Sequence, residues 1–167
     1  MRLVSRLQAG LRRVLVVVAP AALLVGASAC ESDMLDEPGS FAGLYSGYFQ
    51  NCAQCHAPGA PGRTSDIEAT LNFATEAEAH QSITQGSASG LVGNQQACNG
   101  VRFLGASYET SLVVAVLDEN VRHGFSLASH PGCDADAISD MTVKVGYPPS
   151  ASFLHNLAAW IEAGAPR

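Results

Sequence analysis

The 167-residue sequence predicts an all-α domain with long loops. Apolar residues recur at three- and four-residue steps in residues 41–50 and again near the C-terminus, the spacing of one face of a helix. Between these segments lie long stretches rich in Gly, Ser and Asn, which favour loops. The sequence shows no internal repeat and no convincing pair of alternating segments that would predict a sheet.

In the first half of the domain, three helices are expected. Residues 41–50 carry an aromatic stripe and run directly into a pair of cysteines, and residues 66–73 form a short second candidate. Thr75 with Glu78 three positions later is a capping box, in which the two side chains satisfy free amides at a helix start. Residues 76–83 should therefore be helical.

The middle of the domain is predicted to be mostly irregular. Residues 86–105 are expected to form a loop because of their Gly, Ser, Asn and Gln content. Residues 107–118 have the length and one-sided apolar pattern of a helix, although valine loses rotamer freedom there. Residues 121–149 are expected to be mostly irregular.

A last helix is predicted near the C-terminus. Ser150 or Ser152 caps its start, and Gly164 and Pro166 close it. Its apolar stripe consists of Phe153, Leu154, Leu157, Trp160 and Ile161.

The most informative motif is Cys52-Ala53-Gln54-Cys55-His56. Two thiols three positions apart on one helical turn can reach the vinyl groups on one porphyrin edge, and the next residue places an imidazole at the iron. A thioredoxin-like pair would sit in a βαβ pattern, which is not evident around Cys52. A zinc site would need two more close-spaced ligands. The motif therefore predicts one covalently bound haem c with His56 as an iron ligand.

Met141 is a candidate for the second iron ligand, because Met or His usually holds the other side of the iron in electron carriers. Met34 lies in a polar segment near the N-terminus, a poor place from which to hold iron. Met141 lies in the irregular stretch before the last helix. It could equally fill a gap in the core, the commonest role of methionine.

The other histidines are the rivals of Met141. His80 falls on a helix face rich in Ala and Glu, and His155 lies off the apolar stripe of the last helix, so both are expected to face solvent. His123 and His130 fall in predicted loops and stay open as alternative ligands.

Residues 1–29 predict a secretory signal peptide. Four arginines precede a 12-residue apolar run at residues 14–25, and the small residues Ala27, Ser28 and Ala29 follow. The run is shorter than the about 20 residues that a membrane-spanning helix needs. The domain at residues 41–167 is therefore expected to be exported.

Cys30 admits two kinds of cleavage. Cutting after Ala29 as an ordinary signal would leave a soluble periplasmic protein. The segment also resembles a bacterial lipoprotein signal, whose cysteine becomes a lipidated N-terminus, although Ala27 stands where Leu is most common. Cys98 and Cys133 can pair in an oxidising compartment, which leaves Cys30 as an odd thiol. We therefore favour lipidation of Cys30, with residues 30–40 as a tether to the membrane.

The exported chain is strongly acidic. Fifteen acidic and five basic residues follow Cys30, which gives a formal charge of −10. This charge argues against nucleic acid as a partner. It favours redox partners with a basic docking surface, although it could also serve solubility alone.

From residue 41 onward the sequence resembles the class I c-type cytochromes, in particular small periplasmic monohaem domains of bacteria. The likeness rests on the aromatic segment that enters the cysteine motif, on residues 103–112, and on the last helix around Trp160. The axial methionine of that family lies a little under twenty residues before the terminal tryptophan, so the resemblance implies Met141 as the ligand. Thr142 departs from the proline that often follows this methionine.

The long span between His56 and Met141 also departs from the family and implies insertions. These insertions contain Cys98 and Cys133, for which we predict a disulfide that restrains the segment presenting Met141.

The function expected from these features is electron transfer rather than catalysis, by a lipid-anchored carrier in the bacterial cell envelope. One alternative is a haem enzyme, or a sensor of gas or peroxide, whose distal site is open or displaceable. Another is a haem subunit docked in a larger redox complex.

Overall fold

The computed structural model describes residues 39–64, 69–138, 141–146 and 148–167. All of the described residues belong to one compact unit of the chain. The predicted signal peptide, Cys30 and residues 31–38 of the predicted tether, with Met34, therefore lie outside the described part. Within that part, no helix is long and apolar enough to cross a membrane.

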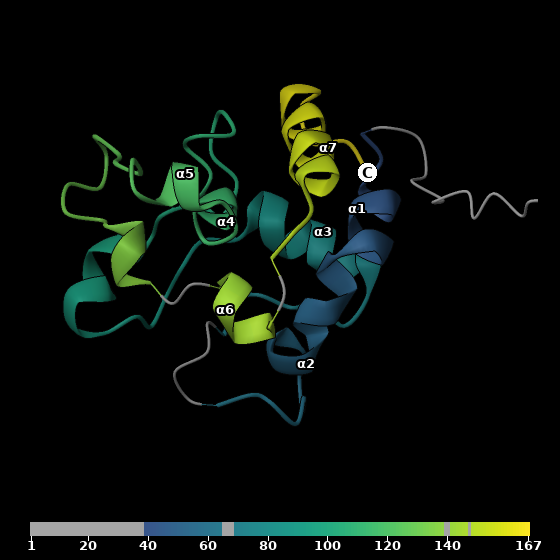
Figure 1. The fold of residues 1–167 in the computed structure, drawn as a ribbon. Helices are drawn as coiled ribbons and strands as arrows, with labels where there is room; N and C mark the ends of the chain where they lie inside the picture. Colours follow the sequence, from purple (N-terminus) through teal and green to yellow (C-terminus); the bar gives the residue numbers. More distant parts are fainter. Residues whose placement is uncertain (1–38, 65–68, 139–140, 147) are drawn as a thin grey trace, which may run out of the picture. The chain divides into compact units, whose positions relative to one another are not determined.

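The described residues are mostly helical, which confirms the all-α prediction (Figure 1). The α-helices are α1 Phe41–Gly47, α2 Ala53–His56, α3 Glu76–Gln85, α4 Leu112–Ala115, α5 Glu119–Arg122, α6 Met141–Val145 and α7 Ala151–Glu162. Short 3₁₀ helices are η1 Phe49–Cys52, η2 Gly93–Cys98 and η3 Ala135–Ala137. In the described ranges, strand-like pairing is confined to isolated bridges between Ser87 and Arg102 and between Leu127 and His130.

The chain through the cysteine motif forms three short helices, α1, η1 and α2, rather than one continuous helix. Ser40 caps α1 by accepting a hydrogen bond from the Gly43 amide, but Tyr48 leaves the helical conformation at φ −151° and ψ −54°. The consecutive side chains of Tyr48 and Phe49 are both buried. A straight helix turns by about 100° between neighbours, so the break allows both rings to enter the core. The prediction of a continuous helix over residues 41–50 is wrong beyond Gly47.

An aromatic core joins the first helix of the domain, α1, to the last one, α7. Helix α1 also contacts α3. Trp160 of α7 is fully buried and its ring lies 5.1 Å from that of Phe41. Phe153 of α7 meets the rings of Tyr48 at 4.7 Å and Phe49 at 5.4 Å. This cluster holds the start of the cysteine motif against the last helix.

The predicted start of α3 at Thr75 is confirmed, with one half of the capping box formed. The Thr75 hydroxyl accepts a hydrogen bond from the Glu78 amide, and the Glu78 carboxylate accepts one from this hydroxyl at 2.8 Å. His80 on this helix is half-buried, so the expectation that it faces solvent is wrong. Its ring packs edge-on against Phe41 and Trp160 because α3 lies against α1. His155 is exposed, as expected.

Two other predicted helices differ from the structure. Of the helix expected over residues 66–73, residues 66–68 lie outside the described part and residues 69–73 are not helical; there the Phe73 amide donates to the carbonyl of His56 rather than to its own turn. The helix expected over residues 107–118 contracts to α4, because Ser111 is fully buried and binds the turn before it. Its hydroxyl donates to the Ser107 carbonyl at 2.7 Å and accepts from the Gly105 amide at 3.0 Å.

The remaining irregular regions contain more structure than predicted. The loop expected at residues 86–105 includes η2, and residues 121–149 include η3 and α6. Cys98 at the end of η2 and Cys133 just before η3 lie at disulfide distance, and both are buried. The side-chain amide of Gln95 reinforces this connection by donating to the Ala137 carbonyl at 2.6 Å.

Removing the disulfide should destabilise the protein. The link closes a loop of 35 residues, and chain entropy predicts a loss of about 3.5–4 kcal/mol in the free energy of unfolding for Cys98→Ser with Cys133→Ser. Urea unfolding of both proteins measures this loss. Thiol labelling of the denatured, unreduced wild type should leave Cys98 and Cys133 unmodified; labelling of both would rule the disulfide out.

The cap of α7 offers a matched pair of variants. The Ser150 hydroxyl accepts a hydrogen bond from the Phe153 amide at 3.1 Å, so Ser150 rather than Ser152 is the cap. Ser150→Ala should lower the free energy of unfolding by about 1 kcal/mol. Ser152→Ala keeps that bond and should change stability much less. Equal losses in urea unfolding would contradict this assignment.

Candidate functional site

The cysteine motif borders two adjoining cavities of about 120 and 420 Å³. The residues shared by both walls are Cys55, His56, Leu71, Val113, Val116, Met141 and Lys144. Because they share these walls, we treat the two spaces as the smaller and larger lobes of one motif cavity. The larger lobe has the size of a ligand pocket in other proteins.

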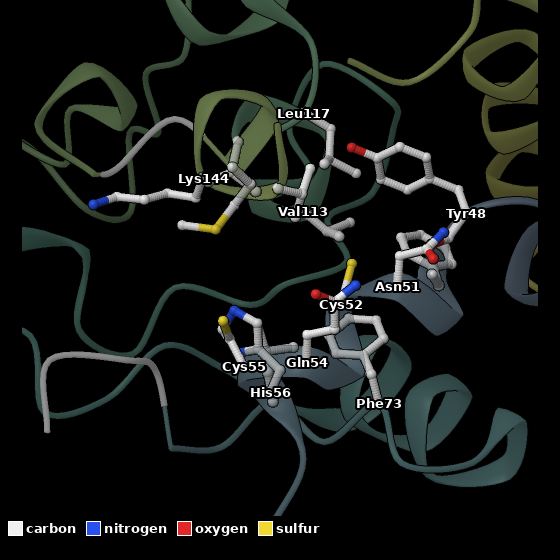
Figure 2. Close-up of a pocket in the computed structure, with 15 residues that line it drawn as sticks. Tyr48, Asn51, Cys52, Gln54, Cys55, His56, Phe73, Val113, Leu117 and Lys144 are labelled. Carbon is white, nitrogen blue, oxygen red and sulfur yellow. The ribbon is translucent and has the colours of Figure 1, made fainter. Parts of the chain in front are cut away.

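The walls of the motif cavity are mainly apolar. Tyr48, Phe49, Phe73 and Leu117 line the smaller lobe, which also contains Cys52. The larger lobe extends toward the disulfide-linked region. Its further apolar lining is Ala88, Leu91, Phe103, Leu112 and Ile138. Figure 2 shows Cys52, Cys55 and His56 on one side of the hollow, with Val113 and Leu117 across from them.

His56 at the end of α2 is held from a distant part of the sequence. His56 is only 9% exposed, and it lines both lobes. The His56 carbonyl accepts a hydrogen bond of 2.7 Å from the Phe73 amide, and the two rings meet edge to face at 5.9 Å. The Tyr45 hydroxyl in turn donates to the Phe73 carbonyl at 3.0 Å. Phe73 was not predicted as part of the site, because no sequence motif marks it.

The two motif cysteines are half-buried and are not joined to each other. Burial raises the pKa of the Cys52 thiol to about 12, so this thiol is protonated at neutral pH. Thiol–disulfide exchange needs a thiolate, and the raised pKa therefore counts against a thioredoxin-like role. In the described ranges no three His, Cys, Asp or Glu side chains gather as a metal site, so the zinc alternative gains no support.

Gly62 allows the chain after the motif to fold back directly on it. Its amide donates to the Gln54 carbonyl at 3.1 Å. A β-carbon at this position would lie 2.7 Å from the Cys55 sulfur and 2.8 Å from the Gln54 oxygen. Residue 62 must therefore lack a side chain, a requirement that local sequence rules did not reveal.

Met141 reaches the motif cavity from the opposite wall. It is the first residue of α6, it is half-buried, and it lines both lobes. Its amide donates to the Val116 carbonyl at 3.2 Å, which ties α6 to the end of α4. His56 and Met141, which are far apart in the sequence, thus border the same space.

The rival histidines lie elsewhere; among the described residues, His56 alone of the histidines lines the motif cavity. His123 is exposed and contacts the carboxylates of Asp136 at 3.0 Å and Glu119 at 3.4 Å. These hydrogen bonds, to Asp136 first, raise the pKa of His123. His130 is 3.1 Å from the hydroxyl of Ser129.

The residues around the motif cavity fit an iron porphyrin. The apolar walls suit the face of a porphyrin ring, and both motif thiols open onto the space. An imidazole and a thioether, the pair that holds iron in many electron carriers, are available from His56 and Met141.

Comparison of the chain with protein-family models, with curated proteins and with solved structures found no significant match.

Filling the position of Gly62 should disturb the motif. Gly62→Ala places a methyl group against the Cys55 sulfur and the Gln54 carbonyl. Overpacking of this kind costs about 1–3 kcal/mol, which thermal unfolding can measure. Gly47→Ala is the control, because a β-carbon there meets nothing within 4 Å. A stable Gly62→Ala protein with unchanged reactivity of Cys55 would contradict the close approach.

Proposed function

We propose that this protein is a monohaem c-type cytochrome that transfers single electrons in the bacterial cell envelope. Cys52 and Cys55 would bind the haem covalently through thioethers, with His56 and Met141 as the axial ligands of the iron. One observation carries the proposal: the buried His56 of a C-x-x-C-H motif and Met141 line the same apolar cavity.

The chain's own residues would set the properties of this centre. Bound haem supplies a one-electron couple between ferrous and ferric iron. The Met141 thioether would favour the ferrous form, because a soft sulfur ligand raises the potential. The apolar side chains around the motif would exclude water. With both axial positions occupied by protein, no position is left for a substrate, which supports a carrier rather than an enzyme.

The proposed location follows from the N-terminal sequence. Residues 1–29 would direct export, and a lipid on Cys30 would anchor the domain to the periplasmic face of a membrane. The formal charge of −10 after Cys30 would favour redox partners with basic docking surfaces and disfavour nucleic acid.

A second candidate function is a haem enzyme or sensor whose Met141 ligand can be displaced. The observation that favours it is the light packing of α6, the helix that begins with Met141. None of its five residues is buried, and Val143 is 73% exposed. The larger lobe beside Met141 would also leave space for a small ligand such as peroxide or NO.

Optical spectroscopy separates these functions. The full chain, expressed with the haem c maturation machinery, should retain haem after denaturation and acid extraction. The ferric protein should show the weak charge-transfer band of methionine–iron coordination, and Met141→Ala should abolish it. His123→Ala and His130→Ala are matched controls that should keep the band, because neither residue lines the motif cavity.

Two results would redirect or end the proposal. A wild-type protein with high-spin iron that binds CO readily would favour the second candidate function. Failure to retain haem after denaturation would contradict both. Cys52→Ala with Cys55→Ala should abolish covalent retention and give a largely unfolded or degraded product, because the haem would fill the centre of the core.

A further inference from the structure

We propose that Lys144 binds a carboxylate of the porphyrin and thereby raises the reduction potential of the centre. This inference rests on the proposed function, since it concerns the side chain that meets the anionic edge of the haem. Lys144 is the only lysine in the 167-residue sequence, and it lines both lobes of the motif cavity.

The position of Lys144 on α6 couples it to the proposed iron ligand. It lies three residues after Met141, about one helical turn, so both side chains project from the same face. Both side chains border both lobes. Figure 2 shows the Lys144 side chain extending with its amine pointing away from Cys52.

Charge distinguishes Lys144 from the rest of the cavity wall. Apart from His56, no other described lining residue can carry a positive charge. Nor does the Lys144 amine have a hydrogen-bond or ion-pair partner in the described part of the chain. Arg102, by contrast, donates to the Thr84 carbonyl, and Arg63 donates to the Ala69 carbonyl. Lys144 is thus the cation that remains available to an anionic ligand in the motif cavity.

The chemistry of haem supplies the matching anion. Its two carboxylate side chains sit on the ring edge remote from the vinyl groups, and the motif cysteines would fix the vinyl edge. A lysine amine that points away from Cys52 is therefore placed for the carboxylate edge. Contact between ammonium and carboxylate is a charge-assisted hydrogen bond, stronger than a neutral one. A positive charge near the iron stabilises the ferrous form relative to the ferric form, which raises the potential.

The test uses the holoprotein and two readouts. Lys144→Met should lower the midpoint potential in a spectroelectrochemical titration, up to a tenfold change in the ratio of reduced to oxidised protein. A tenfold change corresponds to about 59 mV for one electron. The same variant should shift the carboxylate bending band of the haem in resonance Raman spectra. Lys144→Arg keeps the charge and should stay near the wild type in both readouts.

Arg167→Met is the matched control, because Arg167 is exposed like Lys144 and carries the same charge, but it does not line the cavity. Unchanged potential and Raman band in Lys144→Met would overturn the inference. So would equal shifts of potential in Lys144→Met and Arg167→Met, or a shifted potential with an unchanged carboxylate band. All these outcomes require covalently bound haem in the wild type, so they are distinguishable from failure of the proposed function.

Acetylation of the holoprotein gives an independent check without a mutation. Because the sequence contains one lysine, acetylation neutralises Lys144 and no other side-chain amine. Reductive methylation of the same amine keeps its charge and is the matched control. The acetylated protein, and not the methylated one, should reproduce the lowered potential of Lys144→Met; equal potentials in the two modified proteins would contradict a role for this charge.

Discussion

The hydrogen bond from the Phe73 amide to the His56 carbonyl connects the aromatic core of the domain to the cysteine motif. It holds the backbone of His56 from a segment beyond the next loop, while the Phe73 ring covers one edge of the imidazole. Phe73 is itself held by the Tyr45 hydroxyl of α1 and by the ring of Phe49 at 5.6 Å. The orientation of the histidine therefore depends on the packing that joins α1 to α7.

The two sides of the motif cavity differ in how deeply their residues are buried in the core. His56 is buried and tied to the aromatic core, whereas Met141 begins a five-residue helix that buries none of its residues. A hydrogen bond from the Met141 amide to the Val116 carbonyl ties α6 to the end of α4, and the half-buried Met141 and Val145 pack against the core. Few buried contacts permit local opening at low free energy. An electron carrier and a ligand-binding haem protein would differ in how firmly this second side is held.

Few of the described residues that line the motif cavity can carry a charge. The residues after Cys30 have an excess of ten negative charges, yet the single lysine of the sequence stands at the wall of a mainly apolar space. Burial also keeps the Cys52 thiol protonated, which counts against a redox-active pair. Both features point to an uncharged interior with one cation at its margin.

The sequence by itself determined the helical class, the helix cap at Thr75, the last helix, and the C-x-x-C-H motif, because each depends on residues within a few positions of one another. Only the tertiary structure chose Ser150 over Ser152, broke the first helix at Tyr48, and packed His80 against Trp160. It also decided that Phe73, Gly62 and Lys144 belong to the site. Periodicity and capping describe one turn at a time, whereas these contacts join separate segments, and only packing of the whole domain brings such segments together.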